Sequence, residues 1–83
     1  MNVQVRYFAS LRESIGLSAE SVQTQSTDVA GLRAELIARG GAYADCLATG
    51  RPVRVAVNQV MALETTALPA DCEVGFFPPV TGG

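Results

Sequence analysis

The sequence contains no histidine, no lysine and no tryptophan, and it has only two cysteines. Without histidine there is no imidazole to act as a general base or to bind zinc in the usual way. Without lysine there is no amine for a Schiff base and no phosphate-binding P-loop. Cys46 and Cys72 are too far apart in the sequence for a metal knuckle or a redox pair. We therefore expect no metal site and little chemistry performed by side chains.

The two cysteines fit a structural role better than a chemical one. We interpret each as a small buried hydrophobic residue, which is the usual fate of a free cysteine. A disulfide is the less favoured alternative, because nothing else in the sequence points to an oxidising compartment.

Positive charge is also scarce, and all of it is arginine. The net charge is −2 and the isoelectric point is near 4.8, which argues against nucleic acid as the main partner. A strand pattern begins at Asn2 with no basic and apolar leader before it, and no apolar run approaches about 18 residues. We therefore expect neither a signal peptide nor a membrane span, and we expect a cytoplasmic protein. The basic residues are Arg6, Arg12, Arg33, Arg39, Arg51 and Arg54.

Alternating apolar residues predict strands in an 83-residue chain that is long enough for one domain. In the first strand, Asn2–Phe8, the residues Val3, Val5 and Tyr7 share one face. The predicted strands are Asn2–Phe8, Glu20–Gln25, Val53–Val57, Val60–Leu63 and Cys72–Phe77. Turns are expected at Asn58-Gln59 and over Leu68-Pro69-Ala70-Asp71.

Helical signals lie between these strands. Ala9–Ile15 favours a short helical turn that ends at Gly16. A main helix is predicted over Asp28–Arg39, capped by Ser26 or Thr27 and ended by Gly40-Gly41. Asp28 in its first turn and Arg39 in its last suit the helix dipole. Its buried stripe is formed by Val29, Leu32, Leu36 and Ile37. The segment 42–50 is expected to be a short helix or a turn.

This order of strands and helix predicts an α+β fold of the β-grasp (ubiquitin-like) type. One main helix crosses one face of a mixed sheet, and the other face is solvated unless it binds a partner. We place the domain at residues 1–77 and a flexible, extended Gly-Gly tail at residues 78–83.

The C-terminal stretch joins a stiff apolar segment to two residues without side chains. It reads Phe76-Phe77-Pro78-Pro79-Val80-Thr81-Gly82-Gly83. Proline keeps the base of such a tail extended, and glycine lets the backbone approach another surface closely. We expect the tail to enter a narrow channel and to present the carboxylate of Gly83 as the reacting group, with Gly82 and Thr81 giving access. The alternative is a frayed terminus.

The strand phase places two aromatic residues on the outward face of the sheet. Phe8 shares its phase with Gln4 and Arg6, and Phe77 shares its phase with Glu73. If the first and last strands are neighbours, the two rings form an exposed apolar patch beside the tail, and such patches commonly bind partners. The alternative is that each ring curls over an edge of the sheet.

Several stretches resemble the small, sulfur-carrying subunits of molybdopterin synthases. The resemblance rests on Tyr7-Phe8-Ala9 followed by Arg12-Glu13 and Gly16, on the turn Val57-Asn58-Gln59, and on the stretch from Glu73 to Gly83. It spans the whole chain, and its C-terminal part is the most specific. The family usually has Asp-Gly-Asp before the last strand, where this chain has Ala70-Asp71-Cys72. We expect this difference to change the turn and not the chemistry.

The resemblance implies a role in molybdenum cofactor biosynthesis. In the family, a ubiquitin-activating-type adenylyltransferase uses ATP and magnesium to adenylate the terminal glycine, and sulfur then replaces AMP to give a thiocarboxylate. The sulfur is delivered to cyclic pyranopterin monophosphate in the large synthase subunit, which supplies the catalytic side chains. The small subunit is thus a non-catalytic sulfur donor that binds no cofactor.

The same resemblance implies a heterotetramer with the large subunit. Burial of Met61 in the core is the alternative to a partner contact there. The expected partner-binding residues are Phe8, Met61, Phe77, Pro78, Pro79 and Val80.

Other functions fit the same features. A carrier of this fold could supply sulfur for thiamine, cysteine or tRNA thiolation, a ubiquitin-like modifier would join its terminus to a lysine of a target, and a plain binding module would have an inert tail. The missing lysines would keep an activated tail from acylating its own chain, but the arginine bias of a GC-rich genome explains them as well.

Overall fold

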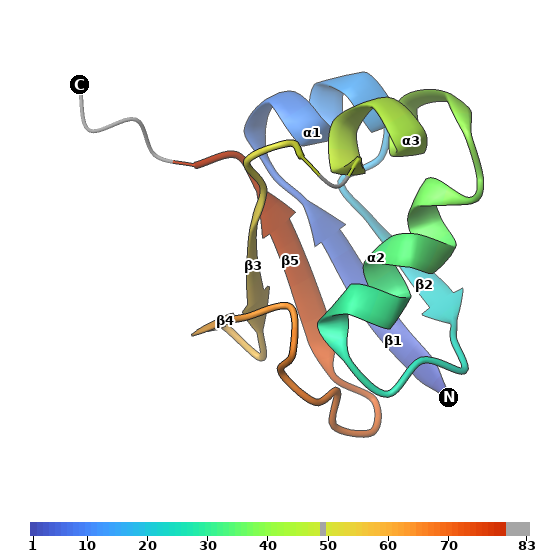
Figure 1. The fold of residues 1–83 in the computed structure, drawn as a ribbon, viewed down its shortest axis with the longest axis vertical. Coiled ribbons are helices and arrows are strands. Elements are labelled where there is room, and N and C mark those ends of the chain that lie inside the picture. The colour runs from blue at the N-terminus through green and yellow to red at the C-terminus, as the bar shows by residue number, and fades with distance from the viewer. Residues whose placement is uncertain (49, 80–83) are drawn as a thin grey trace.

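Five strands form one mixed sheet in the order β2-β1-β5-β3-β4 (Figure 1). The computed structural model describes residues 1–48 and 50–79. This is the β-grasp arrangement that the sequence predicts. The strands are β1 (Asn2–Tyr7), β2 (Ala19–Gln23), β3 (Arg54–Val57), β4 (Val60–Ala62) and β5 (Glu73–Phe77), and the helices are α1 (Ala9–Ile15), α2 (Val29–Ile37) and α3 (Gly41–Leu47).

The last strand of the chain lies in the centre of the sheet. β5 runs parallel to β1 and antiparallel to β3, with Gly75 opposite both Arg6 and Ala56. The prediction that the first and last strands are neighbours is thus confirmed. The chain leaves the sheet from the end of this central strand at Phe77, so the tail starts between two other strands and not at an edge.

One face of the sheet packs against the helices and forms the core. In β1 the exposed and buried residues alternate as expected, with Val3, Val5 and Tyr7 buried. The ring of Tyr7 stacks on that of Phe76 across the β1–β5 pair, with 6.4 Å between the ring centroids. The core cluster is completed by Leu11, Val22, Val29, Leu32, Leu36, Leu47, Val55, Val57, Leu68, Cys72 and Val74.

The main helix α2 differs from its prediction at both ends. Its N-cap is Asp28, whose Oδ1 accepts a hydrogen bond of 2.9 Å from the backbone N–H of Gly31. The predicted caps are wrong, because Ser26 instead donates its hydroxyl to Glu35 (2.6 Å). The helix ends at Ile37, so Arg39 lies beyond its last turn and pairs with Glu20.

Of the two predictions for segment 42–50, the short helix is correct over most of the described part. α3 begins at Gly41, directly after Gly40, and both glycines have positive φ values of 55° and 77° respectively. Such backbone favours glycine because it has no Cβ. The prediction that this pair ends the main helix is wrong, because α2 ends at Ile37 with Ala38 as its C-cap, and Gly40 is instead the N-cap of α3.

The remaining turns match the predicted positions. α1 ends at Gly16 in the left-handed conformation (φ 87°). Asn58 and Gln59 both have positive φ in the β3–β4 turn, and the Asn58 Oδ1 accepts a 2.9 Å hydrogen bond from the Glu73 N–H. Asp71, where the family usually has glycine, is also left-handed (φ 55°), which aspartate tolerates better than most residues.

Several strand boundaries differ by one or two residues from those predicted. β1 stops at Tyr7, so Phe8 precedes α1 instead of ending the strand. β2 covers Ala19–Gln23 instead of Glu20–Gln25, β3 and β5 each begin one residue late, and β4 ends at Ala62. Val53 is only half-buried, just before β3. Among the described residues, no helix is long and apolar enough to cross a membrane.

Candidate partner-binding site at the root of the tail

Phe8 and Phe77 meet edge to face on the outward side of the sheet. Their ring centroids are 6.1 Å apart, with an interplanar angle of 83°. Phe8 is 42% exposed, and Phe77 is half-buried. The pairing of these aromatic residues predicted from strand phase is therefore confirmed. The alternative that each ring curls over an edge of the sheet is wrong, because Phe77 belongs to the central strand and Phe8 packs against Gly75 of the same strand.

The backbone around Ala9 turns Phe8 outward. The Phe8 N–H donates to the Phe76 carbonyl oxygen (3.1 Å), which prolongs the β1–β5 pairing by one bond. Ala9 then adopts φ 53°, a left-handed conformation that costs a residue with a Cβ about 1–2 kcal/mol. This turn starts α1 and leaves the Phe8 ring on the face away from the core.

The two rings border a shallow apolar hollow of about 360 Å³. Gly75 lies beneath Phe8, because a Cβ built there would come within 3.0 Å of the Phe8 Cε2 atom. A glycine at this position lets the aromatic ring pack closely against the backbone of the central strand. The hollow is lined by Phe8, Ala56, Gln59, Glu73, Gly75 and Phe77.

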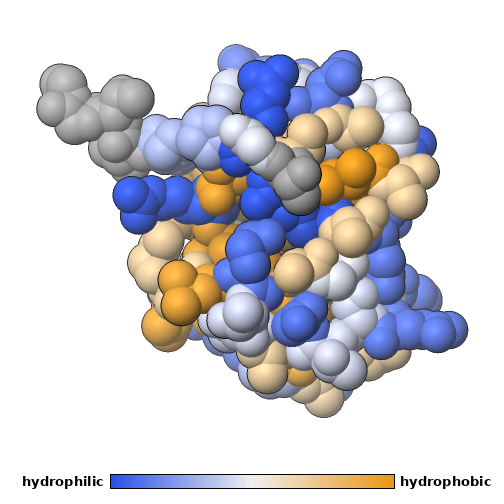
Figure 2. All heavy atoms as spheres, viewed as in Figure 1, coloured by the Kyte–Doolittle hydropathy of each residue, from blue (hydrophilic) through white to orange (hydrophobic). Residues whose placement is uncertain are grey.

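Met61 extends this apolar surface toward the edge of the sheet. It is the cross-strand partner of Ala56, which lines the hollow, and 54% of it is exposed. Burial of Met61 in the core is thus wrong. Val60 and Leu63 beside it are also well exposed, and Figure 2 shows apolar side chains gathered over β4, below the point where the tail leaves. An exposed apolar residue such as Met61 beside an apolar hollow is typical of a protein interface.

Charged residues form a rim on the β1 side of the hollow. Arg6 Nη1 lies 3.6 Å from Glu73 Oε1, and the Arg6 guanidinium lies 6.0 Å from the centroid of the Phe8 ring. Both side chains are partly exposed, so this ion pair contributes little to stability. An apolar centre with a polar rim is the usual composition of an interface.

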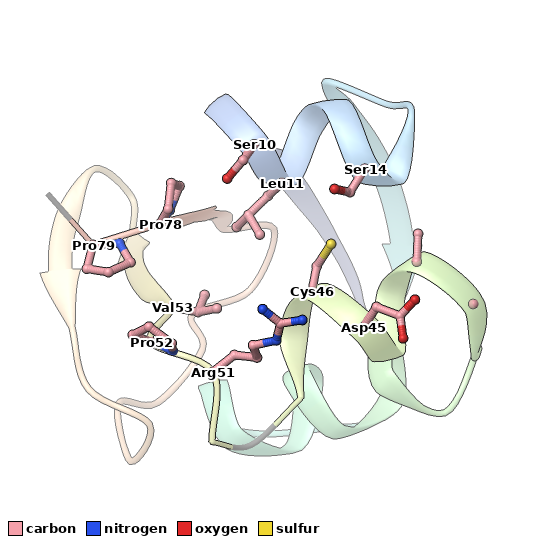
Figure 3. Close-up of a pocket in the computed structure, with 12 residues that line it drawn as sticks. Ser10, Leu11, Ser14, Asp45, Cys46, Arg51, Pro52, Val53, Pro78 and Pro79 are labelled. Carbon is pink, nitrogen blue, oxygen red and sulfur yellow. The ribbon is translucent and has the colours of Figure 1, made fainter. Parts of the chain in front are cut away.

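Two prolines lead from this surface into the tail. Pro78 and Pro79 follow directly on β5, and both are half-buried. They border a second hollow of about 640 Å³ between α1, α3 and the tail (Figure 3). We call it the helix-side hollow; the sequence did not predict it. The predicted tail residues Val80, Thr81, Gly82 and Gly83 lie outside the described residues.

A carboxylate, two tyrosines and an arginine join β2 to the helices next to Phe8. Glu20 accepts hydrogen bonds from the hydroxyls of Tyr7 (2.8 Å) and Tyr43 (2.7 Å) and from Arg39 (3.0 Å). Burial opposes the ionisation of Glu20, but these three hydrogen bonds outweigh it and lower the pKa of its carboxyl. Burial, together with the bond to Glu20, raises the pKa of Tyr7. The network fixes the end of β1, from which Phe8 projects.

The described residues offer few groups for catalysis. Within residues 1–48 and 50–79 no three histidine, cysteine, aspartate or glutamate residues lie close enough together to hold a metal ion. Both cysteines are free thiols: Cys72 is buried, whereas Cys46 is only half-buried. Burial raises the pKa of the Cys72 thiol, which makes it a poor nucleophile. The surface around Phe8 and Phe77 is suited to docking.

Comparisons with known proteins match this geometry. A protein of Escherichia coli (strain K12) named molybdopterin synthase sulfur carrier subunit is 37% identical to this chain over 81 residues, which cover 98% of this chain and 99% of that protein. A solved complex of subunits 1 and 2 of the molybdopterin-converting factor from Helicobacter pylori contains a chain with a TM-score of 0.68 and 25% identity, with full coverage of both chains.

A second solved structure shares the fold. SAMP1 from Haloferax volcanii superposes with a TM-score of 0.78 over the whole of both chains, but it is only 22% identical, so this likeness shows the fold alone. The model of the ThiS family matches residues 5–83, which is nearly the entire sequence. The chain belongs to the ThiS family.

Proposed function

We propose that this chain is the sulfur carrier subunit of a molybdopterin synthase and that it carries sulfur as a thiocarboxylate on Gly83. The observation that supports this most is the Phe8–Phe77 pair, an exposed apolar docking surface at the point where the tail leaves the central strand. The near full-length likeness to the Escherichia coli carrier subunit supports the same function.

The main partner in this proposal is the large synthase subunit. The Helicobacter pylori structure is a complex of two such subunits, and its small chain resembles this one along its full length. Phe8, Phe77 and Met61 contact the large subunit, while Pro78 and Pro79 guide the tail into it. Assembly as a heterotetramer is part of the proposal.

The tail becomes reactive only after activation, because a carboxylate is a poor electrophile. An adenylyltransferase of the ubiquitin-activating type joins the Gly83 carboxylate to AMP and releases pyrophosphate from ATP. A sulfide nucleophile then attacks the acyl carbon and displaces AMP, which leaves the thiocarboxylate. Its sulfur is a good nucleophile toward cyclic pyranopterin monophosphate. Gly82 and Thr81 leave the narrow path to this terminus open.

The mass of the intact chain tests this chemistry. After incubation with the activating enzyme, ATP and sulfide, we expect a gain that matches one oxygen replaced by one sulfur. A chain without Gly83 should show no gain and an almost unchanged unfolding midpoint. Gly82→Val should also fail, because its β-branched side chain restricts the backbone and widens the tail. If a chain without Gly83 still supports pterin sulfuration, the proposal is wrong.

The intact mass, together with a pterin sulfuration assay and a search for conjugates in cell lysate, separates the alternative functions. A ubiquitin-like modifier would give conjugates of higher mass through target lysines, and a carrier for another pathway would form the thiocarboxylate but fail to sulfurate the pterin. A binding module with an inert tail would gain no mass. We still predict, as the sequence suggests, that this protein acts in the cytoplasm and that the chain itself binds no cofactor.

A further inference from the structure

Two arginines beside the tail have no acidic partner among the described residues. Arg6, Arg33 and Arg39 each form a salt bridge, with Glu73, Glu64 and Glu20 respectively. Arg51 and Arg54 form none within residues 1–48 and 50–79, and both are exposed.

Arg54 lies next to the end of the central strand. It is the first residue of β3 and the cross-strand partner of Phe77, the last residue of β5. Directly opposed residues on neighbouring strands lie about 5 Å apart and point to the same face. The Arg54 side chain therefore starts beside the Phe77 ring, on the outward side of the tail.

Arg51 lies on the other side of the same two prolines. It lines the helix-side hollow together with Pro78 and Pro79, and Figure 3 shows its guanidinium directed into that hollow. Its backbone is held on both sides: its N–H donates to the Ala48 carbonyl oxygen (2.9 Å), and its own carbonyl oxygen accepts from Arg33 Nη2 (3.2 Å). The buried Arg33 thus fixes the position from which the Arg51 side chain projects.

Acidic groups near this end are either engaged or turned away. Asp45 also lines the helix-side hollow, but its carboxylate points away from Arg51 in Figure 3. Glu73 is paired with Arg6, and it lies at the opposite end of β5 from the tail, as does Asp71. Figure 2 shows strongly hydrophilic side chains where the tail leaves. A chain of net charge −2 therefore exposes two cations at its tail.

We propose that Arg51 and Arg54 steer this chain, tail first, onto an acidic surface around the mouth of the tail channel in the large synthase subunit. The inference rests on the proposed function, and it adds a prediction about the charge of the surface that the large subunit presents to this chain. A surface that encloses Pro78 lies beside both arginines, because Arg51 lines the same hollow as Pro78 and Arg54 is paired with Phe77. Charges act on such a surface over the Debye length, which is about 10 Å at 0.1 M salt. A basic mouth would repel them, whereas carboxylates there would attract them during the diffusional approach.

Association rates measured against the purified large subunit test the proposal. At about 0.01 M salt we expect Arg51→Gln and Arg54→Gln each to slow association about threefold, and the double variant about tenfold, with little change in the dissociation rate. At about 0.15 M salt, where the Debye length falls to about 8 Å, the difference should shrink. Both side chains are exposed, so the unfolding midpoints should match that of the original chain.

Charge-matched controls separate a local effect from net charge. Gln23→Glu changes the net charge by the same amount as one arginine substitution, but Gln23 pairs with Asn2 at the far end of the sheet. Gln23→Glu combined with Gln25→Glu matches the double variant. We expect these controls to slow association much less.

The outcomes are distinct. Faster association of the arginine variants would mean a basic mouth, and equal slowing by the Gln23 and Gln25 controls would mean a general charge effect; either result overturns the steering proposal. Both leave the proposed function intact as long as the original chain binds the large subunit. Failure of the original chain to bind, together with no gain in mass with the activating enzyme, would remove the proposed function itself.

Discussion

The ring of Phe8 lies over the backbone of Gly75, so close that a Cβ at position 75 would come within 3.0 Å of the Phe8 Cε2 atom. Gly75→Ala should therefore shift the Phe8 ring by a few tenths of an ångström while every aromatic side chain is kept. We expect binding to the large subunit to weaken by about threefold, which corresponds to about 0.7 kcal/mol. Because the partly exposed ring can move, the free energy of unfolding should change by less than about 1 kcal/mol. Titration calorimetry and denaturant unfolding measure the two effects.

Unchanged affinity of Gly75→Ala for the large subunit would show that binding does not depend on the position of the Phe8 ring. Ser21→Ala is a suitable control, because Ser21 is an exposed residue of the edge strand β2 and does not line the apolar hollow.

Phe8→Ala and Phe77→Ala should separate docking from folding. A well-packed aromatic anchor is typically worth about 2 kcal/mol or more in binding, or roughly thirtyfold in the dissociation constant. Stability should fall by less than the about 3–5 kcal/mol expected for truncation of a core phenylalanine. Calorimetric titration against the large subunit, paired with unfolding of each free variant, measures both. A core-sized loss of stability with full affinity would rule out the docking surface.

Glu20→Gln should destabilise the protein at neutral pH, because the ionised carboxylate accepts three hydrogen bonds. We expect a loss of about 1–2 kcal/mol in the free energy of unfolding. The pKa of Glu20 is lower in the folded chain than its ordinary value of 4.5, so its contribution is present above that pH and is lost as the pH falls through the folded pKa. The difference in the free energy of unfolding between the original chain and Glu20→Gln should thus become smaller below about pH 4.5.

Unfolding curves recorded from acid to neutral pH test this dependence. Glu13→Gln removes an exposed carboxylate on α1 and should change stability by less than about 0.5 kcal/mol throughout. A difference in stability between the original chain and Glu20→Gln that stays constant down to acidic pH would show that ionisation of Glu20 does not support the network.

The two cysteines should differ in their reactivity toward a thiol reagent and in the stability lost when each is replaced by alanine. A thiol reagent should modify the half-buried Cys46 of the folded protein before Cys72, which is 1% exposed. Cys72→Ala should cost about 1–2 kcal/mol through the cavity it leaves, and Cys46→Ala less. Both variants should still transfer sulfur. A well-folded Cys72→Ala protein that fails to transfer it would point to a persulfide on that side chain.

The outward face could be predicted because side chains in a strand alternate strictly. Phe8 and Phe77 keep their face even though Phe8 lies one residue beyond β1, since alternation sets direction without needing the boundary. The face of Met61 could not be predicted, and the reason is physical. β4 has only three residues, so its alternation of apolar and polar residues is too short to show which side chains face outward. The pairing of Met61 with Ala56 in the sheet decides this instead.

The helix ends could not be predicted, because long-range partners decide them. Ser26 has the chemistry of a cap, but Glu35 takes its hydroxyl, and Asp28 then caps α2. The sequence carried one unused signal, which is that Arg33 shares a helix face with Val29 and Leu36. An arginine at such a position needs buried acceptors, and Arg33 finds the Leu47 carbonyl oxygen at 2.7 Å.

The central position of β5 has a mechanical consequence for the tail. A partner that draws the tail into a channel, or releases it, pulls on Pro78 along the direction of β5. Hydrogen bonds to β1 and β3 flank that strand on both sides, so the load is shared between two ladders and acts in shear. An edge strand loaded across its ladder would instead peel away one bond at a time. Tension on the tail is therefore divided between the two ladders and does not fall on a single row of hydrogen bonds.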